Sequence, residues 1–226
     1  MLRSMQAALI LAILFVVGVA SAHATSNSPE LLNFTFLPNL TTVGNYYDGG
    51  AVYNVPNYGV SFTNFWGLNN GFGPFATDPT KTPIIFINNT VNGPAGTNVT
   101  GIMTVGPGFS TGLNFLFTAA FGAGQSELIT VWSGPNGTGT ILATLRIYSN
   151  DASCGTPALC IWTSVGVGFS GTAHSVTFSG PADELGISDI TLNSTRTALP
   201  EPSSIYLLAA GLAGISAGGL RRFFKV

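Results

Sequence analysis

The sequence predicts an all-β fold for the middle of this chain, built either as a sandwich of two packed sheets or as a barrel. Short runs rich in Val, Ile, Thr and aromatic residues recur through residues 31–193, and clusters of Gly, Pro and Asn separate them. Several runs alternate apolar and polar side chains, which turns one face of each strand toward a core. No long segment of this part combines a 3.6-residue apolar period with helix caps.

The first element along the chain, residues 1–24, has the three parts of a secretory signal peptide. Arg3 precedes an apolar run at residues 7–20, and small residues follow up to Ala24. We expect cleavage after Ala24, with Ala22 as the alternative position. A transmembrane helix is the competing interpretation, but about 14 apolar residues span only about 21 Å, less than the ~30 Å hydrocarbon core of a bilayer.

The second element is the body, residues 25–198, in which we expect two packed sheets. Strands are predicted at residues 31–37, 59–65, 84–88, 99–105, 113–119, 127–133, 140–148, 159–167, 175–179 and 185–192. Alternation predicts four groups of apolar side chains, and the members of each group share one face of one strand. The groups are Leu32, Phe34 and Phe36; Leu113, Phe115 and Phe117; Ile141, Ala143, Leu145 and Ile147; Val176 and Phe178. The alternation changes phase between Ile187 and Ile190, which predicts a bulge.

One connection in the body has the residues of a hairpin loop. The segment SGPNGTG, residues 133–139, separates two alternating runs. Its Asn136-Gly137 pair can adopt positive φ, as tight hairpin turns require. We therefore expect the strands before and after this segment to pair directly.

Charge is scarce throughout the chain and excludes one class of partner. Only 7% of the residues are charged, against about 25% in a typical soluble domain. Residues 25–200 contain eight acids and three bases, a net charge of −5. Nucleic-acid binding requires several Lys or Arg to neutralise phosphates, so we expect no nucleic-acid partner. A polar, nearly uncharged surface favours an extracellular or matrix protein over a cytosolic enzyme.

The last element, residues 199–226, has the composition of a membrane anchor. Residues 203–220 are apolar and uncharged, and a helix of that length spans about 27 Å. Arg221, Arg222 and Lys225 follow directly, and the positive-inside rule places this basic tail, residues 221–226, in the cytoplasm and the body outside. A buried core helix is the alternative, but no polar face contrasts with the apolar one.

Pro200, Glu201 and Pro202 stand immediately before that apolar stretch. The Pro-Glu-Pro motif, the apolar helix and the basic tail together resemble the PEP-CTERM sorting signal of Gram-negative bacteria that secrete exopolysaccharide. The resemblance implies an exosortase-type sorting enzyme as partner, a transient inner-membrane stage, cleavage near the motif, and transfer to the cell surface or release. The two prolines also keep the motif extended, where an enzyme can read it.

The body looks like the sandwich domains common among PEP-CTERM proteins, through the segments NYYDGG, YGVSF, VWSGPNGTGTILATL and LGISDITL. This resemblance implies a jelly-roll-like β-sandwich of the carbohydrate-binding-module type, with no settled activity. It also implies that a late acid-rich strand can lie beside a structural calcium ion. Here the strand keeps only Asp189 where relatives often have two consecutive acids.

Cys154 and Cys160 are the only cysteines. In an exported chain they are expected to form a disulfide, which closes a short loop and stabilises the fold by about 2 kcal/mol. Free thiols or a pair of metal ligands are the alternatives, but a metal site requires further ligands. No cofactor is expected, with a structural Ca²⁺ at Asp183, Glu184 and Asp189 as a weak alternative to a solvated turn.

Two constellations suggest further chemistry. The segment GFSTG places Ser110 in a G-x-S-x-G pattern, with Asp151 and His174 following in hydrolase order, but an alternating strand follows where a nucleophile elbow needs a helix. Trp132, Tyr46 and Tyr47 are the aromatic residues best suited to stack on sugar rings, if they are not core residues.

Three functions are consistent with these observations. The first is a non-enzymatic surface or matrix protein sorted through Pro200-Glu201-Pro202, in contact with exopolysaccharide in a biofilm. The second is a carbohydrate-binding module on the same anchor, which requires aromatic side chains on an exposed face. The third, a secreted hydrolase, requires Ser110, Asp151 and His174 to converge. An ice-binding surface would need a flat, regular threonine array, and the sequence has no such period.

Overall fold

The structure is a computed structural model that describes residues 28–50, 55–69, 78–88, 90, 95–151, 154 and 159–195. The expected signal peptide, residues 1–24, and the expected sorting segment, residues 199–226, lie outside the described residues. Within the part described, no helix is long and apolar enough to cross a membrane.

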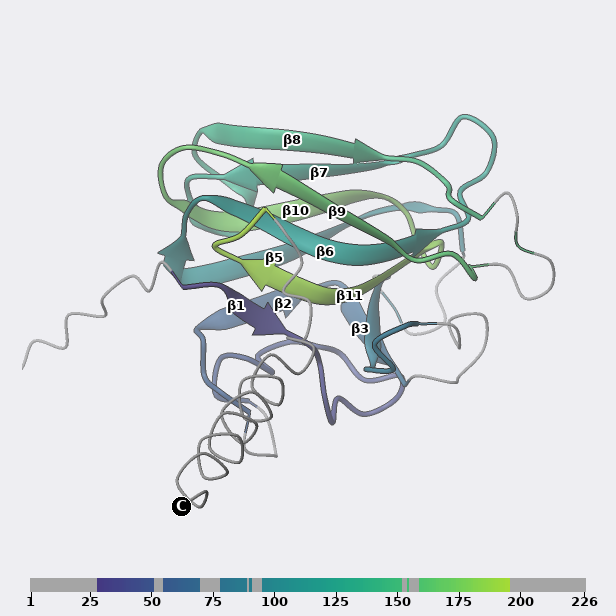
Figure 1. Cartoon of the computed structure of the whole chain (residues 1–226), viewed down its shortest axis with the longest axis horizontal. Helices are drawn as coiled ribbons and strands as arrows, with labels where there is room; N and C mark the ends of the chain where they lie inside the picture. The colour runs from purple at the N-terminus through teal and green to yellow at the C-terminus, as the bar shows by residue number, and fades with distance from the viewer. Residues whose placement is uncertain are drawn as a thin grey trace, which may run out of the picture.

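Two antiparallel sheets form a sandwich, and their strands overlap in the view down the shortest axis (Figure 1). The six-stranded sheet has the order β3 (Phe65–Leu68), β4 (Ile84–Ile87), β11 (Leu185–Leu192), β6 (Gly112–Ala119) and β9 (Thr163–Gly168), with β1 (Glu30–Leu32) also on β11. The five-stranded sheet has the order β2 (Val60–Thr63), β5 (Asn98–Phe109), β10 (Ala173–Pro181), β7 (Glu127–Trp132) and β8 (Ile141–Ile147). The all-β prediction is confirmed.

Alternate side chains of both sheets meet in one apolar core between them. Phe178 of β10 lies at its centre, with edge-to-face contacts to Phe65 (5.5 Å between ring centroids) and Phe115 (5.8 Å). All three rings are fully buried. Burying such a side chain contributes roughly 1.5–3 kcal/mol, and each aromatic pair about 0.5–1.5 kcal/mol more.

The expected first strand is longer than the real one. β1 ends at Leu32, and Phe34 and Phe36 both have positive φ (55° and 71°), so the chain leaves the sheet there. As a result Phe34 is buried but Phe36 is 64% exposed, and the prediction of one shared face is wrong for Phe36. Positive φ at Asn64 likewise divides the strand expected at residues 59–65 into β2 and β3.

Two local predictions are confirmed. The β11–β6 register shifts between Ser188 and Thr191, and Asp189 has φ 49°, so the phase change is a bulge. β7 and β8 pair directly around the loop at residues 133–140, with Asn136 at φ 54° and Gly137 at φ 72°.

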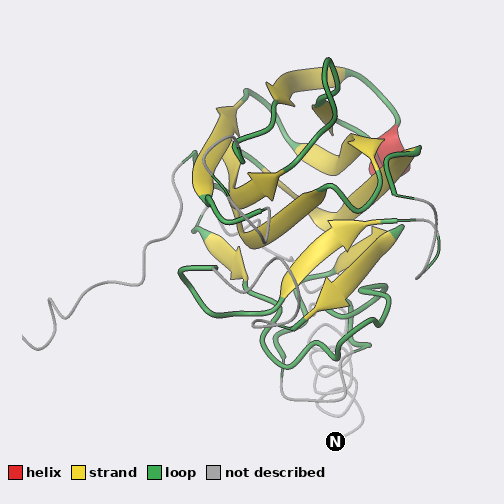
Figure 2. Cartoon of the chain, turned by 90° about the vertical axis from the view of Figure 1, so that its right-hand side faces the viewer, coloured by secondary structure: helices red, strands yellow, loops and turns green. Residues whose placement is uncertain are grey.

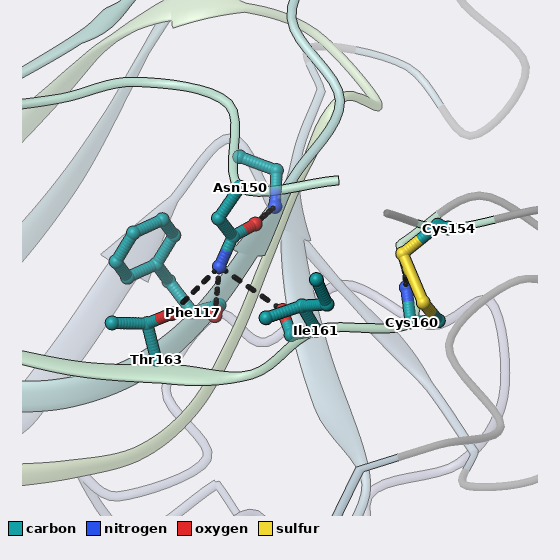
Figure 3. Close-up of a disulfide and its surroundings, with 7 residues drawn as sticks. Phe117, Asn150, Cys154, Cys160, Ile161 and Thr163 are labelled. Atoms are coloured by element: carbon teal, nitrogen blue, oxygen red, sulfur yellow. Dashed lines mark hydrogen bonds between the residues drawn. A yellow bond between two sulfur atoms is a disulfide. The ribbon is translucent and has the colours of Figure 1, made fainter. Parts of the chain in front are cut away.

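A smaller apolar cluster covers part of the outer face of the six-stranded sheet, around Leu68, Ile84, Phe86 and Leu159. The disulfide between Cys154 and Cys160 lies in the adjoining segment, as predicted (Figure 3). Asn150 ties this segment to β6: its Oδ1 accepts from the backbone N of Ala119 (2.8 Å), and its Nδ2 donates to the carbonyl of Ile161 (3.0 Å).

Candidate functional site

The outer face of the five-stranded sheet is lined by hydroxyl groups, and we call it the hydroxyl face. Its side chains alternate with core residues such as Phe62, Met103, Val176 and Ile129, so they point away from the sandwich interior. Strand register arranges them in three rows: Ser61, Thr104, Ser175 and Trp132; Thr63, Ile102, Thr177, Thr130 and Thr144; Thr100, Ser179, Leu128 and Arg146. Apart from Ile102, Leu128, Trp132 and Arg146, every side chain in these rows is Ser or Thr.

The rows run across strands that are far apart in the chain, which is why no threonine period appears in the sequence. The face is nevertheless not an open, regular array. Ser175 is fully buried, and Thr130 and Thr177 are at most 9% exposed. The face therefore does not have the exposed lattice that ice binding would require.

The β7–β8 loop covers the first row. It contains a short 3-10 turn, Pro135–Gly137, drawn red in Figure 2. The hydroxyl of Ser175 donates to the carbonyl of Gly134 (2.6 Å) and accepts from the backbone N of Gly137 (2.9 Å). A Cβ on Gly137 would lie 2.8 Å from Cγ2 of Thr177, so only glycine allows this close approach.

Trp132 lies on the outer face of the sheet, as its position in the alternation of β7 predicted. It lies at the end of the hydroxyl face that the β7–β8 loop covers. Its indole is half-buried, and Nε1 donates to Oγ1 of Thr177 (3.0 Å). The indole therefore lies over the sheet and is fixed to it, in a position that shields the middle row.

The opposite end of the hydroxyl face is open and hollowed into a depression of about 340 Å³. Its lining residues are mainly polar: Asn98, Val99, Thr100, Ser126, Leu128, Arg146, Ser179 and Gly180. The hydroxyls of Thr100 and Ser179 are hydrogen-bonded to each other (2.9 Å), and Nη1 of Arg146 donates to Oγ of Ser126 (2.6 Å). This depression brings together hydroxyl, amide and guanidinium groups, which recognise polar ligands.

The proposal of sugar-facing roles for Tyr46 and Tyr47 is wrong in this structure, because both rings are buried. The hydroxyl of Tyr47 accepts from the backbone N of Phe34 (2.8 Å), and that of Tyr46 donates to the carbonyl of Thr35. Both side chains hold the segment after β1 against the core. Burial raises the pKa of Tyr47.

The exposed aromatic residue of this region is Phe36 instead. It borders an apolar depression of about 280 Å³ that Leu37, Pro38, Val43 and other residues also line. Sequence reasoning missed this exposure because the alternation of apolar residues continues beyond the end of β1.

The three acids considered for calcium are not brought together. Asp183 accepts from Nδ2 of Asn88 (2.7 Å) in the turn before β11, whereas Asp189 lies within β11 and interacts with Thr80 and Thr82. Among the described residues no group of three or more acidic, His or Cys side chains could hold a metal ion. Asp183 and Glu184 both precede β11, and the first residues of that strand separate them from Asp189, since each strand residue advances about 3.3 Å.

Asp189 instead approaches Asp78, a buried acid that the sequence did not single out. Oδ2 of Asp78 accepts from the hydroxyl of Ser188 (3.2 Å), and Oδ1 accepts from the backbone N of Thr80 (3.0 Å). Burial, with a smaller contribution from the neighbouring charge of Asp78, raises the pKa of Asp189 to about 6.

Glu127 is a second buried acid without a predicted role. It starts β7 and is 0% exposed, and neither carboxylate oxygen has a hydrogen-bond partner among the residues that the structure describes. Burial raises its pKa to about 8. Its carboxylate fills the space beside Gly180, where a Cβ would lie 2.0 Å from Oε2.

The hydrolase constellation does not assemble. Ser110 precedes the first residue of β6, while Asp151 follows Asn150, which is bonded to Ala119 at the last residue of β6. An eight-residue strand separates the two groups, which is roughly 25 Å. Nδ1 of His174 lies 3.3 Å from the carbonyl of Val105, away from Asp151.

No protein-family model matches this chain, and a comparison with curated protein sequences finds no match. Among solved structures, the K2 cleaved adhesin domain of Lys-gingipain is similar, with a TM-score of 0.45 and 10% identity over 73% of this chain and 99% of that one. A family 6 carbohydrate-binding module has a TM-score of 0.37 and 16% identity over 74% and 93%.

A third similar structure is a carbohydrate-binding module of lichenase 5A from Cellvibrio mixtus, in complex with cellotriose. Its TM-score is 0.34, with 13% identity over 60% of this chain and 91% of that one.

Proposed function

We propose that this chain is an exported, non-enzymatic surface protein whose sandwich binds polysaccharide at the open end of the hydroxyl face. The observation that carries the binding proposal is the 340 Å³ depression lined by Thr100, Ser126, Ser179, Asn98 and Arg146. Neutral hydroxyl and amide groups can donate to and accept from sugar hydroxyls, and Leu128 offers an apolar surface to a ring. The volume is at the lower end of the range for ligand sites, about 300–1,000 Å³.

Binding is tested by electrophoresis of the purified full chain through gels that contain a polysaccharide. We expect the wild type to be retarded and the double variant Thr100→Val, Ser179→Ala to migrate freely, because it lacks the paired hydroxyls at the depression. Thr144→Val is the matched control, since it removes a hydroxyl from the same face outside the depression. Equal retardation of the double variant and the wild type would contradict the proposed site.

Export and sorting are the second part of the proposal. The Pro-Glu-Pro motif, the apolar stretch at residues 203–220 and the tail with Arg221, Arg222 and Lys225 support it. The last strand described, β11, ends at Leu192, before this segment begins. The sorting enzyme would act on a form held in the inner membrane and deliver the sandwich to the cell surface or its exopolysaccharide.

Sorting is tested by measuring intact mass and cell fraction in the native host. We expect the wild type outside the cell, without residues 1–24 and without the segment after about Pro200. Glu201→Ala should remain in the membrane at higher mass, while Thr197→Ala, just upstream of the motif, should behave as the wild type. Retention of every form in the membrane with an intact C-terminus would reduce residues 199–226 to a plain anchor.

A further inference from the structure

Arg146 is the cationic group of the open depression. It extends from the outer side of β8, opposite Leu128 of β7, and its side chain is exposed. The 2.6 Å bond from Nη1 to Ser126 fixes the guanidinium at the wall of the depression. A guanidinium has five N–H donors in a planar fork, so most of them are available to a ligand.

The charge distribution makes this position distinctive. Residues 25–200 carry eight acids against three bases, and the resulting net negative charge disfavours an anionic polymer. Among the described residues that line the depression there is no Asp or Glu, and the neighbouring Glu127 points into the sandwich interior. The described part of the chain contains two Lys or Arg residues, Lys81 and Arg146. Lys81 lies beside Asp78 at the six-stranded sheet, so Arg146 is the one basic residue of the described part at the hydroxyl face.

The other lining groups decide which anion fits. Asn98, Thr100 and Ser179 present neutral donors and acceptors, as sugar hydroxyls require. A guanidinium can form two parallel hydrogen bonds with a carboxylate or with a phosphate or sulfate ester, so the geometry of the fork alone does not select the anion. A single Arg balances the one negative charge of a carboxylate, whereas a phosphate monoester carries about −1.5 to −2. A sulfate ester, also singly charged, is the competing ligand.

The geometry points to recognition of a carboxylate-bearing sugar, a uronate residue within a polysaccharide, with Arg146 on the carboxylate and the hydroxyls of Thr100 and Ser179 on the ring. This inference rests on the polysaccharide binding proposed above and names the class of sugar. Arg146 is a specificity residue here, because neutral sugars would use the hydroxyl groups without it.

The test is calorimetric titration of the purified full chain with an oligogalacturonate, with its methyl ester as the neutral counterpart and with a sulfated galactan oligosaccharide. We expect the acid to bind at least about tenfold more tightly than the ester, the typical gain of a charge-assisted hydrogen bond. Arg146→Gln should abolish the difference, and Arg146→Lys should remove most of it because the planar fork is lost. Lys81→Gln makes the same change of net charge elsewhere and should preserve the preference.

The other possible results distinguish a failure of the uronate inference from a failure of polysaccharide binding. If acid and ester bind equally and Arg146→Gln changes neither, the uronate inference is overturned while polysaccharide binding stands. If the sulfated oligosaccharide binds as tightly as the acid and Arg146→Lys is unimpaired, the site recognises a point charge and the carboxylate assignment is wrong. If none of the oligosaccharides binds, the proposed function fails together with the inference.

Discussion

Glu127 places an acidic side chain in the sandwich interior, where its two carboxylate oxygens have no hydrogen-bond partner in the described part of the chain. Because burial raises its pKa from 4.5 to about 8, the folded protein keeps a proton that the unfolded chain releases. The contribution to stability is therefore fully present below about pH 4.5 and is lost as the pH rises to about 8. We expect the free energy of unfolding to fall by a few kcal/mol, as an order of magnitude, across this window.

Glu127→Gln should remove most of that slope, because the amide has no charge to bury at any pH in the window. Urea unfolding at pH 5, 6.5 and 8 measures it, with Asp48→Asn as the control because Asp48 is exposed. A wild-type slope retained in Glu127→Gln would show that another group, such as Asp189, dominates the pH dependence.

At the scale of elements, runs of β-branched and aromatic residues between turn residues were enough to predict β4 to β8, β10 and β11. In β6 and β10, period-2 alternation also identified the side chains that face the core. It failed at Phe36, since the pattern of side chains continues where backbone of positive φ has already left the sheet. The phase change in β11 was visible because a bulge moves Ile190 back to the core side.

The candidate site was harder to predict than the strands that carry it. Thr100, Ser179 and Arg146 come from β5, β10 and β8, and only strand order and register place them in one row. These residues are far apart in the sequence, so the sequence alone does not indicate that they form a row. Tyr46 and Tyr47 failed as sugar-facing candidates for a related reason, since the loop that contains them folds onto the core.

Asn150 gives a prediction for the segment between β8 and β9. Its side chain accepts one hydrogen bond from β6 and donates to the carbonyl of Ile161 and the hydroxyl of Thr163 (Figure 3). Asn150→Ala leaves these groups without partners, so we expect a loss of about 2–4 kcal/mol, more than the ~2 kcal/mol for the Cys154→Ser, Cys160→Ser variant. Thermal unfolding of both variants measures this, and a smaller loss for Asn150→Ala would show that the disulfide stabilises the fold more than the hydrogen bonds of Asn150 do.

At the scale of the whole molecule, the two ends of the body meet. β1 pairs with β11, with Glu30 opposite Leu192, although the whole sandwich lies between them in the sequence. Pairing between such distant segments makes folding depend on contacts that form late, and sandwiches accordingly fold in milliseconds to seconds. The boundaries expected at residues 25 and 198 enclose both strands.

A chain of residues 25–198 should therefore unfold in one cooperative transition, whereas a chain that starts at residue 33 should be weaker. The shorter chain lacks β1 and with it Leu32, a fully buried core side chain whose loss leaves a cavity. Removing such a side chain costs about 2–5 kcal/mol, and the lost pairing with β11 adds to it. Urea unfolding followed by tryptophan fluorescence measures the difference, with residues 28–198 as the control that keeps β1. Equal midpoints for the chains starting at residues 28 and 33 would show that β1 adds nothing to the stability of the sandwich, and that the two sheets fold and pack without it.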